Sequence, residues 1–209
     1  FLATKISFIN AMAEVSDRAD ADVVALAAIL GDDPRIGRRF LDAGIGFGGG
    51  CLPKDIRAFS ARADELGVPA LSALLTQVDT INLSARRRAV DLATELCRPQ
   101  LRGSRVAVLG AAFKPLSDDV RDSPSLDIAA QLHARGAEVR IYDPEANGSA
   151  QAAYPNLSYV SGVEAALTGA DVVLHLTEWP EFAHLDAARL GSLVRRRQLV
   201  DGRNKLDPE

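Results

Sequence analysis

The sequence predicts an α/β protein in which a helical first half is joined by a long helix to a doubly wound parallel sheet. Three observations support this fold class. Helical spacing of apolar residues runs through the first 97 residues. After Pro99, short apolar runs alternate with helical stretches, as in βαβ units. Between the halves, one pattern from Leu71 to Cys97 contains neither Gly nor Pro.

Three helical stretches are predicted in the first half, with a glycine-rich loop after the first. They cover residues 1–30, 53–66 and 71–97, and the loop covers 43–50. Pro53 suits the first position of the second helix, and Asp55 in its first turn suits the helix dipole. The third stretch is longer than most globular helices, so it is expected to span two domains or to form a dimer seam.

Four short apolar runs in the second half are predicted to be strands of a parallel sheet that is buried on both faces. They cover residues 105–110, 139–143, 171–176 and 198–201, with helical stretches at 125–133 and 163–167. Ligands of such sheets bind beyond the carboxyl ends of the strands. Here those ends are Gly110 to Lys114, Asp143-Pro144, Thr177-Glu178 and Gly202-Arg203.

Composition narrows the class of partner. The 209 residues carry 24 Lys and Arg against 28 Asp and Glu, a net charge of −4 that gives no footprint for nucleic acid or an anionic membrane. No apolar run approaches the ~20 residues of a membrane span, and no His, Cys and carboxylate spacing suggests a metal site. Only two cysteines occur, which favours a reducing cytoplasm.

The ends of the sequence predict a piece of a longer protein. It has no initiator Met, and it begins at Phe1 already in helical rhythm and without a cap. It stops at residues 206–209 without a closing element.

Cys51 is the first candidate for chemistry. It ends a stretch with five glycines in seven positions, and glycines let a backbone approach a ligand closely. A cysteine just before a helix faces amide N–H groups and the dipole, which favour the thiolate. Lys54 adds positive charge, and Asp55 could act as a base. On these residues alone, an activated thiol and a small buried cysteine stay equally open, whereas Cys97 is expected in the core.

The second half offers two candidate phosphate-binding cations. Lys114 follows the first strand, in a loop that is not G-x-G-x-x-G, and Arg203 follows the last strand. Ser123 is expected to cap the helix after this loop. His175 lies within an apolar strand and is expected to be a satisfied core histidine.

Taken together, the segments resemble the UDP-glucose 6-dehydrogenase family, within the UDP-glucose and GDP-mannose dehydrogenases. The resemblance rests on order and spacing along essentially the whole chain. The stretches that carry it are residues 1–10, Asp33-Pro-Arg-Ile-Gly37 with Phe40-Leu41, Gly46-Phe-Gly-Gly-Gly-Cys-Leu-Pro-Lys-Asp55, Leu109-Gly-Ala-Ala-Phe-Lys-Pro115, Asp118-Asp-Val-Arg-Asp-Ser-Pro124, Tyr142-Asp-Pro144, Thr177-Glu-Trp-Pro180 and Asp201-Gly-Arg-Asn204.

The resemblance implies a three-part enzyme of which this chain matches two parts. Residues 1–97 would form the central helical dimerisation domain, and residues 98–209 a Rossmann-like domain that binds the UDP-sugar. The N-terminal NAD-binding domain has no counterpart here. A catalytic Lys and Asn of the family would lie just before Phe1, so Lys5 is expected to be a helix-surface charge.

The resemblance also implies a reaction, namely the oxidation of UDP-glucose to UDP-glucuronate with two NAD⁺, through a thiohemiacetal and a thioester on Cys51. Asp55 would assist water, and Lys54 and Arg121 would contact NAD. Arg35 would reach the nucleotide sugar of the neighbouring subunit of a homodimer. The remaining substrate positions would be Phe40, Leu41, Asp42, Ala43, Gly44, Gly48, Lys114 and Arg203.

Two alternatives stay open at this point. One is a GDP-mannose 6-dehydrogenase, although Thr177-Glu-Trp-Pro180 and Tyr142-Asp-Pro144 favour UDP-glucose. The other is that the chain by itself is an inactive dimerisation and nucleotide-binding module.

Overall fold

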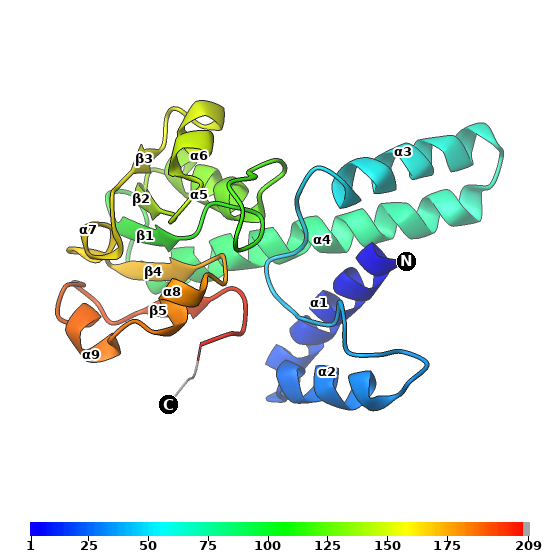
Figure 1. Cartoon of the computed structure of the whole chain (residues 1–209), viewed down its shortest axis with the longest axis horizontal. Helices are drawn as coiled ribbons and strands as arrows, with labels where there is room; N and C mark the ends of the chain where they lie inside the picture. Colours follow the sequence, from blue (N-terminus) through cyan, green and yellow to red (C-terminus); the bar gives the residue numbers. More distant parts are fainter. Residues whose placement is uncertain (207–209) are drawn as a thin grey trace. The chain divides into compact units, whose positions relative to one another are not determined.

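The structure is a computed structural model that describes residues 1–206 (Figure 1). It divides into two compact units, residues 1–85 and residues from 86 onward. The predicted fold class is confirmed, since a helical region precedes a parallel sheet of five strands. The expectation about residues 207–209 lies outside the described residues.

The first unit is helical. Its elements are α1 (Leu2–Ala19), α2 (Val23–Asp32), α3 (Leu52–Glu65) and the first part of α4 (Pro69–Leu96). The helical run predicted over residues 1–30 is therefore two helices. Asp20 takes a left-handed conformation with φ 52° and ends α1, and the Asp22 carboxylate accepts the Val24 N–H at 2.7 Å to begin α2.

Two apolar clusters hold the first unit together. One joins α1 to α2 and to the segment after α2, through Ile9, Ala13, Val23, Ala27, Leu41 and Ala43. The other joins α1, α3 and α4, and includes Ala3, Phe47, Ile56, Leu75 and Val78. Leu41, Ala43 and Phe47 come from the long connection between α2 and α3. The connection that contains the glycine-rich loop is therefore anchored by its own apolar side chains.

The boundary between the units falls inside α4, between Ala85 and Arg86, rather than after Cys97 as expected from the sequence. Arg86 explains the difference. Its side chain is only 4% exposed and forms ion pairs with Asp122 at 3.0 Å and Asp127 at 3.2 Å. The last turns of α4 therefore belong to the second unit, and the change in hydrophobic pattern at Pro99 marks the end of the helix instead.

The second unit is built on a parallel sheet with strand order β3-β2-β1-β4-β5. All four predicted strands and both predicted helices are present. The elements are β1 (Arg105–Leu109), α5 (Pro124–Ala134), β2 (Glu138–Tyr142), α6 (Asn147–Ala153), β3 (Ser158–Tyr159), α7 (Val163–Leu167), β4 (Val172–His175), α8 (Pro180–Ala183), α9 (Ala187–Leu190) and β5 (Leu199–Asp201). The elements not predicted have two to seven residues, too few to show a hydrophobic period.

The connections of this sheet run in two directions. The chain passes from β1 through α5 to β2, and later from β3 through α7 to β4 on the far side of β1. Right-handed crossovers in opposite directions place the two helices on opposite faces, so β1 and β4 are buried almost throughout. The order in which successive strands are added to the sheet reverses between β1 and β4. Ligands of doubly wound sheets bind at such a switch point.

At this point Gly110 is required by both conformation and space. Its φ is +101°, and an added Cβ would lie 2.4 Å from Thr177 Cβ and 2.6 Å from Thr177 N. Gly103 has φ +78° with nothing within 4 Å of an added Cβ. An alanine at Gly103 would therefore meet backbone strain alone, whereas an alanine at Gly110 would meet both backbone strain and a steric clash.

We expect Gly110→Ala to destabilise the chain far more than Gly103→Ala. Positive φ alone costs an alanine about 1 kcal/mol, whereas overpacking against Thr177 adds about 1–3 kcal/mol. Chemical denaturation of both variants measures the difference in free energy of unfolding. Equal losses would show that the contact with Thr177 relaxes freely.

Candidate functional site

Cys51 lies at the start of α3, as the sequence predicted. It is the N-cap residue, its side chain is exposed, and its carbonyl accepts the Asp55 N–H at 2.9 Å. Lys54 Nζ is 3.5 Å from Asp55 Oδ1, and these two side chains are 73% and 69% exposed. Residues three and four positions apart share one face of a helix. An accessible thiol, an amine and a carboxylate are thus grouped within one turn.

Two buried asparagines, which the sequence analysis did not identify, hold the glycine-rich loop that leads to Cys51. Asn82 of α4 is fully buried. Its Oδ1 accepts the Phe47 N–H at 2.7 Å and its Nδ2 donates to the Phe47 carbonyl at 3.1 Å. Asn10 of α1 is 2% exposed and accepts the Gly44 N–H at 2.8 Å. A detectable signal was present, because asparagine is a poor helix former and both stand on apolar helix faces.

Gly46 explains why this loop needs a glycine next to Asn82. Its φ is +92°, and an added Cβ would lie 2.5 Å from Asn82 Oδ1 and 2.8 Å from the Asn82 carbonyl oxygen. The loop backbone therefore packs directly against α4, and its path is fixed by this contact.

The predicted substrate segment 40–44 combines exposed and buried side chains. Phe40 is 41% exposed and has φ 66°, which is rare for a residue with a Cβ. Leu41 and Ala43 are buried in the core, and Asp42 pairs with Arg38 at 3.0 Å. Gly44 and Gly48 contribute backbone only. A ligand here would contact the Phe40 ring and main-chain groups rather than the Leu41 or Ala43 side chains.

Arg35 lies on a turn that Lys5 anchors. The Arg35 guanidinium is 87% exposed and binds Asp33 through two hydrogen bonds, Nε to Oδ1 at 3.0 Å and Nη2 to Oδ2 at 2.5 Å. This pair lowers the pKa of Asp33 and raises that of Arg35. Lys5 Nζ donates to the carbonyls of Ile36 and Gly37, both at 2.9 Å. Lys5 is therefore a clamp on this turn rather than the surface charge expected from the sequence.

In the second unit, Asp143 connects three loops at the ligand edge of the sheet. This buried carboxylate follows β2. Its Oδ2 accepts the N–H groups of Ala111 and Ala112 at 2.7 and 2.9 Å and the Trp179 indole N–H at 3.1 Å. Its Oδ1 accepts the N–H groups of Glu145 and Ala146 at 3.0 and 2.8 Å. The sequence marked Asp143 as a strand end and as part of the motif Tyr142-Asp-Pro144, but gave no sign of these hydrogen bonds.

The helix after β1 begins as predicted. Ser123 Oγ accepts the Leu126 N–H at 3.4 Å and donates to the Ala111 carbonyl at 2.6 Å. In dinucleotide-binding sheets the amides of this loop face a pyrophosphate. Here the amides of Ala111 and Ala112 are taken by Asp143.

Two predicted cations lie on the loop after β1. The Lys114 side chain is exposed and its Nζ stands 5.4 Å from the centre of the Phe113 ring, a cation–π contact. Arg121 is 73% exposed and bound to Asp119, with Nη2 to Oδ2 at 2.7 Å. This hydrogen bond lowers the pKa of the Asp119 carboxyl. Both cations are accessible to an anion in solution.

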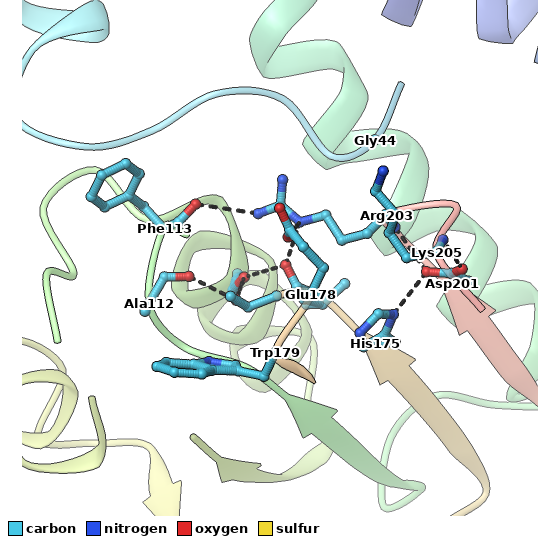
Figure 2. Close-up of polar contacts among 12 residues, drawn as sticks. Gly44, Ala112, Phe113, His175, Glu178, Trp179, Asp201, Arg203 and Lys205 are labelled. Carbon is cyan, nitrogen blue, oxygen red and sulfur yellow. Dashed lines mark hydrogen bonds and ion pairs between the residues drawn. The ribbon is translucent and has the colours of Figure 1, made fainter. Parts of the chain in front are cut away.

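Arg203 is held between the loops that follow β1, β4 and β5, as Figure 2 shows. Its Nε donates to the Leu176 carbonyl at 2.7 Å and stands 3.2 Å from Glu178 Oε2, and Nη2 donates to the Phe113 carbonyl at 3.5 Å. The side chain is 14% exposed. Burial lowers the pKa of the guanidinium, while Glu178 and Asp201 oppose this.

His175 is buried, as expected, but it is not fully satisfied. Its ring is 2% exposed, and Nδ1 lies 2.8 Å from Asp201 Oδ1 (Figure 2). Among residues 1–206, Nε2 has no hydrogen-bond partner, and the ring meets Phe182 edge-on at 5.9 Å. Burial raises the pKa of the Asp201 carboxyl. Hydrogen bonds from His175 and from the backbone N–H groups of Leu206, Arg203 and Lys205 outweigh this effect and lower the pKa to about 2.

A cavity of about 690 Å³ lies elsewhere in the second unit. It is bordered by Tyr142 and by residues 161–165 around the start of α7. The rest of its lining comes from α8, α9 and the segment between them, namely Glu181, His184, Leu185, Asp186, Arg189 and Leu190. None of the predicted site residues lines it. Over residues 1–206, no group of three His, Cys, Asp or Glu side chains is arranged to hold a metal ion, and no helix is long and apolar enough to cross a membrane.

Comparison with known proteins identifies the family. Residues 1–84 match the central domain of the UDP-glucose/GDP-mannose dehydrogenase family, and residues 107–208 match its UDP-binding domain. The chain belongs to this family. The two matches together span most of the sequence, in the order expected from the resemblance.

Individual dehydrogenases of the family agree with this assignment. The chain is 42% identical to the UDP-glucose 6-dehydrogenase of Bacillus subtilis and 38% identical to that of Pseudomonas aeruginosa, over 98% and 100% of its length. It superimposes on a UDP-glucose dehydrogenase from Pyrobaculum islandicum with a TM-score of 0.88 and 39% identity, over 98% of this chain and 45% of that one. The chain spans 44% and 47% of the two curated relatives, so it covers less than half of their length.

We predict that Asp201 stabilises this chain in a pH-dependent way. Its pKa in the folded state, about 2, is below the ordinary 3.8, so the stabilisation is present above pH 4 and is lost as the pH falls through 2. The shift corresponds to about 2 kcal/mol. Urea unfolding of the wild type and Asp201→Asn between pH 6 and 2 should show a stability gap that narrows below pH 4. A constant gap would contradict the assignment.

Proposed function

We propose that this chain is the part of a UDP-glucose 6-dehydrogenase that carries the nucleophile Cys51 and the UDP-binding domain. The main support for this proposal is an exposed thiol at the N-terminus of α3. It lies at the end of a glycine-rich loop that Asn82 holds by hydrogen bonds. The family supplies the reaction class, because its members are nucleotide-sugar dehydrogenases. The substrate would be UDP-glucose, the product UDP-glucuronate, and the compartment the cytoplasm.

Cys51 would act on the aldehyde that forms when the C6 alcohol loses a hydride and a proton. Its thiolate adds to the aldehyde carbon, and the oxygen takes up a proton to give a thiohemiacetal. Loss of the C6 hydride and the hydroxyl proton then leaves a thioester, which water hydrolyses to the acid and the free thiol. A covalent intermediate keeps the aldehyde from escaping and makes the second oxidation another hydride transfer.

Asp55 would assist the water. It lies one helical turn after Cys51, and its exposed carboxylate can accept a proton from a water that approaches the thioester. Lys54 Nζ stands 3.5 Å from this carboxylate. The roles of nucleophile and base thus fall to neighbouring side chains of one helix.

NAD⁺, when bound, would accept one hydride in each oxidation. The described residues fit peripheral contacts with it rather than a cradle, because the amides of Ala111 and Ala112 already donate to Asp143. Lys54 and Arg121, each 73% exposed, are the proposed contacts. We expect the rest of the dinucleotide site in the part of the relatives' length that this chain does not span.

UDP would be held by cations and by main-chain groups. Lys114 is exposed and suited to a phosphate as a point charge, and Arg203 adds donors at the same edge of the sheet. In the first unit, the segment from Phe40 to Gly44 and Gly48 are proposed as further substrate positions. Arg35, exposed on its turn, is proposed to reach the nucleotide sugar of the second subunit in a homodimer formed by the central domain.

Nucleotide choice separates this proposal from a GDP-mannose dehydrogenase. The relatives at 42% and 38% identity are named for UDP-glucose. We expect the 209-residue chain to bind UDP at least about tenfold more tightly than GDP, a factor that one base-specific contact supplies. Isothermal titration with both nucleotides measures this ratio. A preference for GDP would move the protein to the other branch.

We expect the 209-residue chain alone to produce no NADH from UDP-glucose and NAD⁺. The described residues offer only peripheral contacts to the dinucleotide, for the reason given above. Absorbance at 340 nm follows the reaction. NADH formation by the pure chain would show that it holds the cofactor itself.

Replacing Cys51 with Ser in the complete enzyme should lower UDP-glucuronate formation by at least about two orders of magnitude, because a hydroxyl is far less ionised than a thiol. UDP-glucose affinity should hold, since the thiol contributes little to ground-state binding. Cys97→Ala, which alters the buried cysteine, is the matched control and should keep acid formation. Undiminished acid from Cys51→Ser would remove the nucleophile from the mechanism.

A further inference from the structure

The pair formed by His175 and Asp201 has no part in the chemistry proposed above. The two residues lie side by side at the carboxyl ends of β4 and β5, in register with each other. His175 Nδ1 and Asp201 Oδ1 are 2.8 Å apart, and the side chains are 2% and 19% exposed. A pair this close and this buried fixes the position of the carboxylate.

Asp201 in turn organises the segment that carries Arg203. Its Oδ1 also accepts the Arg203 N–H at 3.0 Å, and its Oδ2 accepts the N–H groups of Lys205 and Leu206, each at 2.7 Å. The Gly202 N–H donates to the His175 carbonyl at 2.9 Å. The turn at residues 202–206 is therefore tied to β4 both through the backbone and through the carboxylate of Asp201.

The turn determines where the Arg203 guanidinium lies. From its backbone on the turn, the side chain reaches back to the Leu176 carbonyl and to Glu178, beyond β4 (Figure 2). A shift of the turn would move the guanidinium away from both partners. The chain of contacts thus runs from His175 to Asp201, to the Arg203 backbone and finally to its guanidinium.

Stability alone does not account for His175. Its Nε2 is buried and meets no hydrogen-bond partner in the described part of the chain, and a buried polar atom without a partner is unfavourable. An apolar side chain of similar size in this strand would avoid that cost, but it would leave Asp201 Oδ1 without the histidine donor. The contribution that an apolar residue could not make is the hydrogen bond from Nδ1 to Asp201.

We propose that His175 is a positioning residue for nucleotide binding. It orients the Asp201 carboxylate, which shapes the turn at residues 202–206 and places Arg203 to contact UDP. This inference rests on the proposed function, in which Arg203 belongs to the UDP site. Neither His175 nor Asp201 needs to touch the nucleotide for the effect.

Three substitutions in the 209-residue chain test the proposal. His175→Leu removes the donor to Asp201, and His175→Asn restores an N–H at the position of Nδ1. His133→Asn, at an exposed histidine of α5, is the matched control. Each variant is measured for UDP affinity by calorimetry, for hydrogen exchange at the Arg203, Lys205 and Leu206 amides, and for melting temperature.

For His175→Leu we expect UDP to bind about tenfold more weakly and the three amides to exchange about tenfold faster, because a hydrogen bond to a charged group is worth at least that factor. Its melting temperature should fall by no more than a few degrees, because Asp201 keeps three backbone N–H donors after it loses the histidine. His175→Asn should recover most of both losses, and His133→Asn should match the wild type. If His175→Leu does not fold, His175→Asn tests the proposal by itself. UDP affinity and amide exchange near those of the wild type would support it, and losses in both would overturn it.

Unchanged affinity and unchanged exchange in His175→Leu would overturn the proposal, as would a failure of His175→Asn to recover them. A wild-type chain that does not bind UDP would count against the proposed function instead. In that case the amide exchange still decides whether His175 orders the turn. The two failures are therefore distinguishable.

Discussion

The ligand edge of the second unit depends on one carboxylate. Asp143 accepts five N–H groups, from the loop after β1, from its own turn and from the Trp179 indole. A buried charge is tolerated only when it is fully hydrogen-bonded, so these loops are held in one arrangement. The same bonds use the amides that a dinucleotide-binding domain presents to a pyrophosphate. The sheet thus keeps a doubly wound topology while losing the phosphate cradle that often accompanies it.

In the first unit, buried neutral side chains also hold a loop by hydrogen bonds to its backbone. Asn10 and Asn82 project from α1 and α4 and hold the loop that leads to Cys51. Helices supply fixed positions, and a loop satisfied by helix side chains inherits that rigidity. The glycines then serve a definite purpose at Gly46, where the backbone touches Asn82 too closely for any side chain. The Cys51 thiol is thus accessible at the end of a loop that buried side chains hold.

Most cations assigned to ligands already have a carboxylate beside them. Arg35 binds Asp33, Arg121 binds Asp119, Arg203 stands by Glu178, and Lys54 lies near Asp55. A phosphate that approached any one of these cations would have to share or displace the carboxylate beside it, which reduces the gain from that charge pair. Lys114, over the Phe113 ring, is differently placed and would act as a more direct electrostatic contact.

The sequence by itself determined the fold class, the strands of the sheet and the start of α3 after Cys51, because hydrophobic period and cap residues are local signals. It also identified the family, through motif order and spacing. Only the tertiary structure showed that Asp143, Asn82 and Asp201 fix the loops, and that Lys5 is a clamp. Their hydrogen bonds join residues up to 36 positions apart, and no local pattern encodes which distant N–H group a buried polar side chain will meet. The end of the first unit within α4 was likewise decided by a distant contact, that of Arg86 with Asp122.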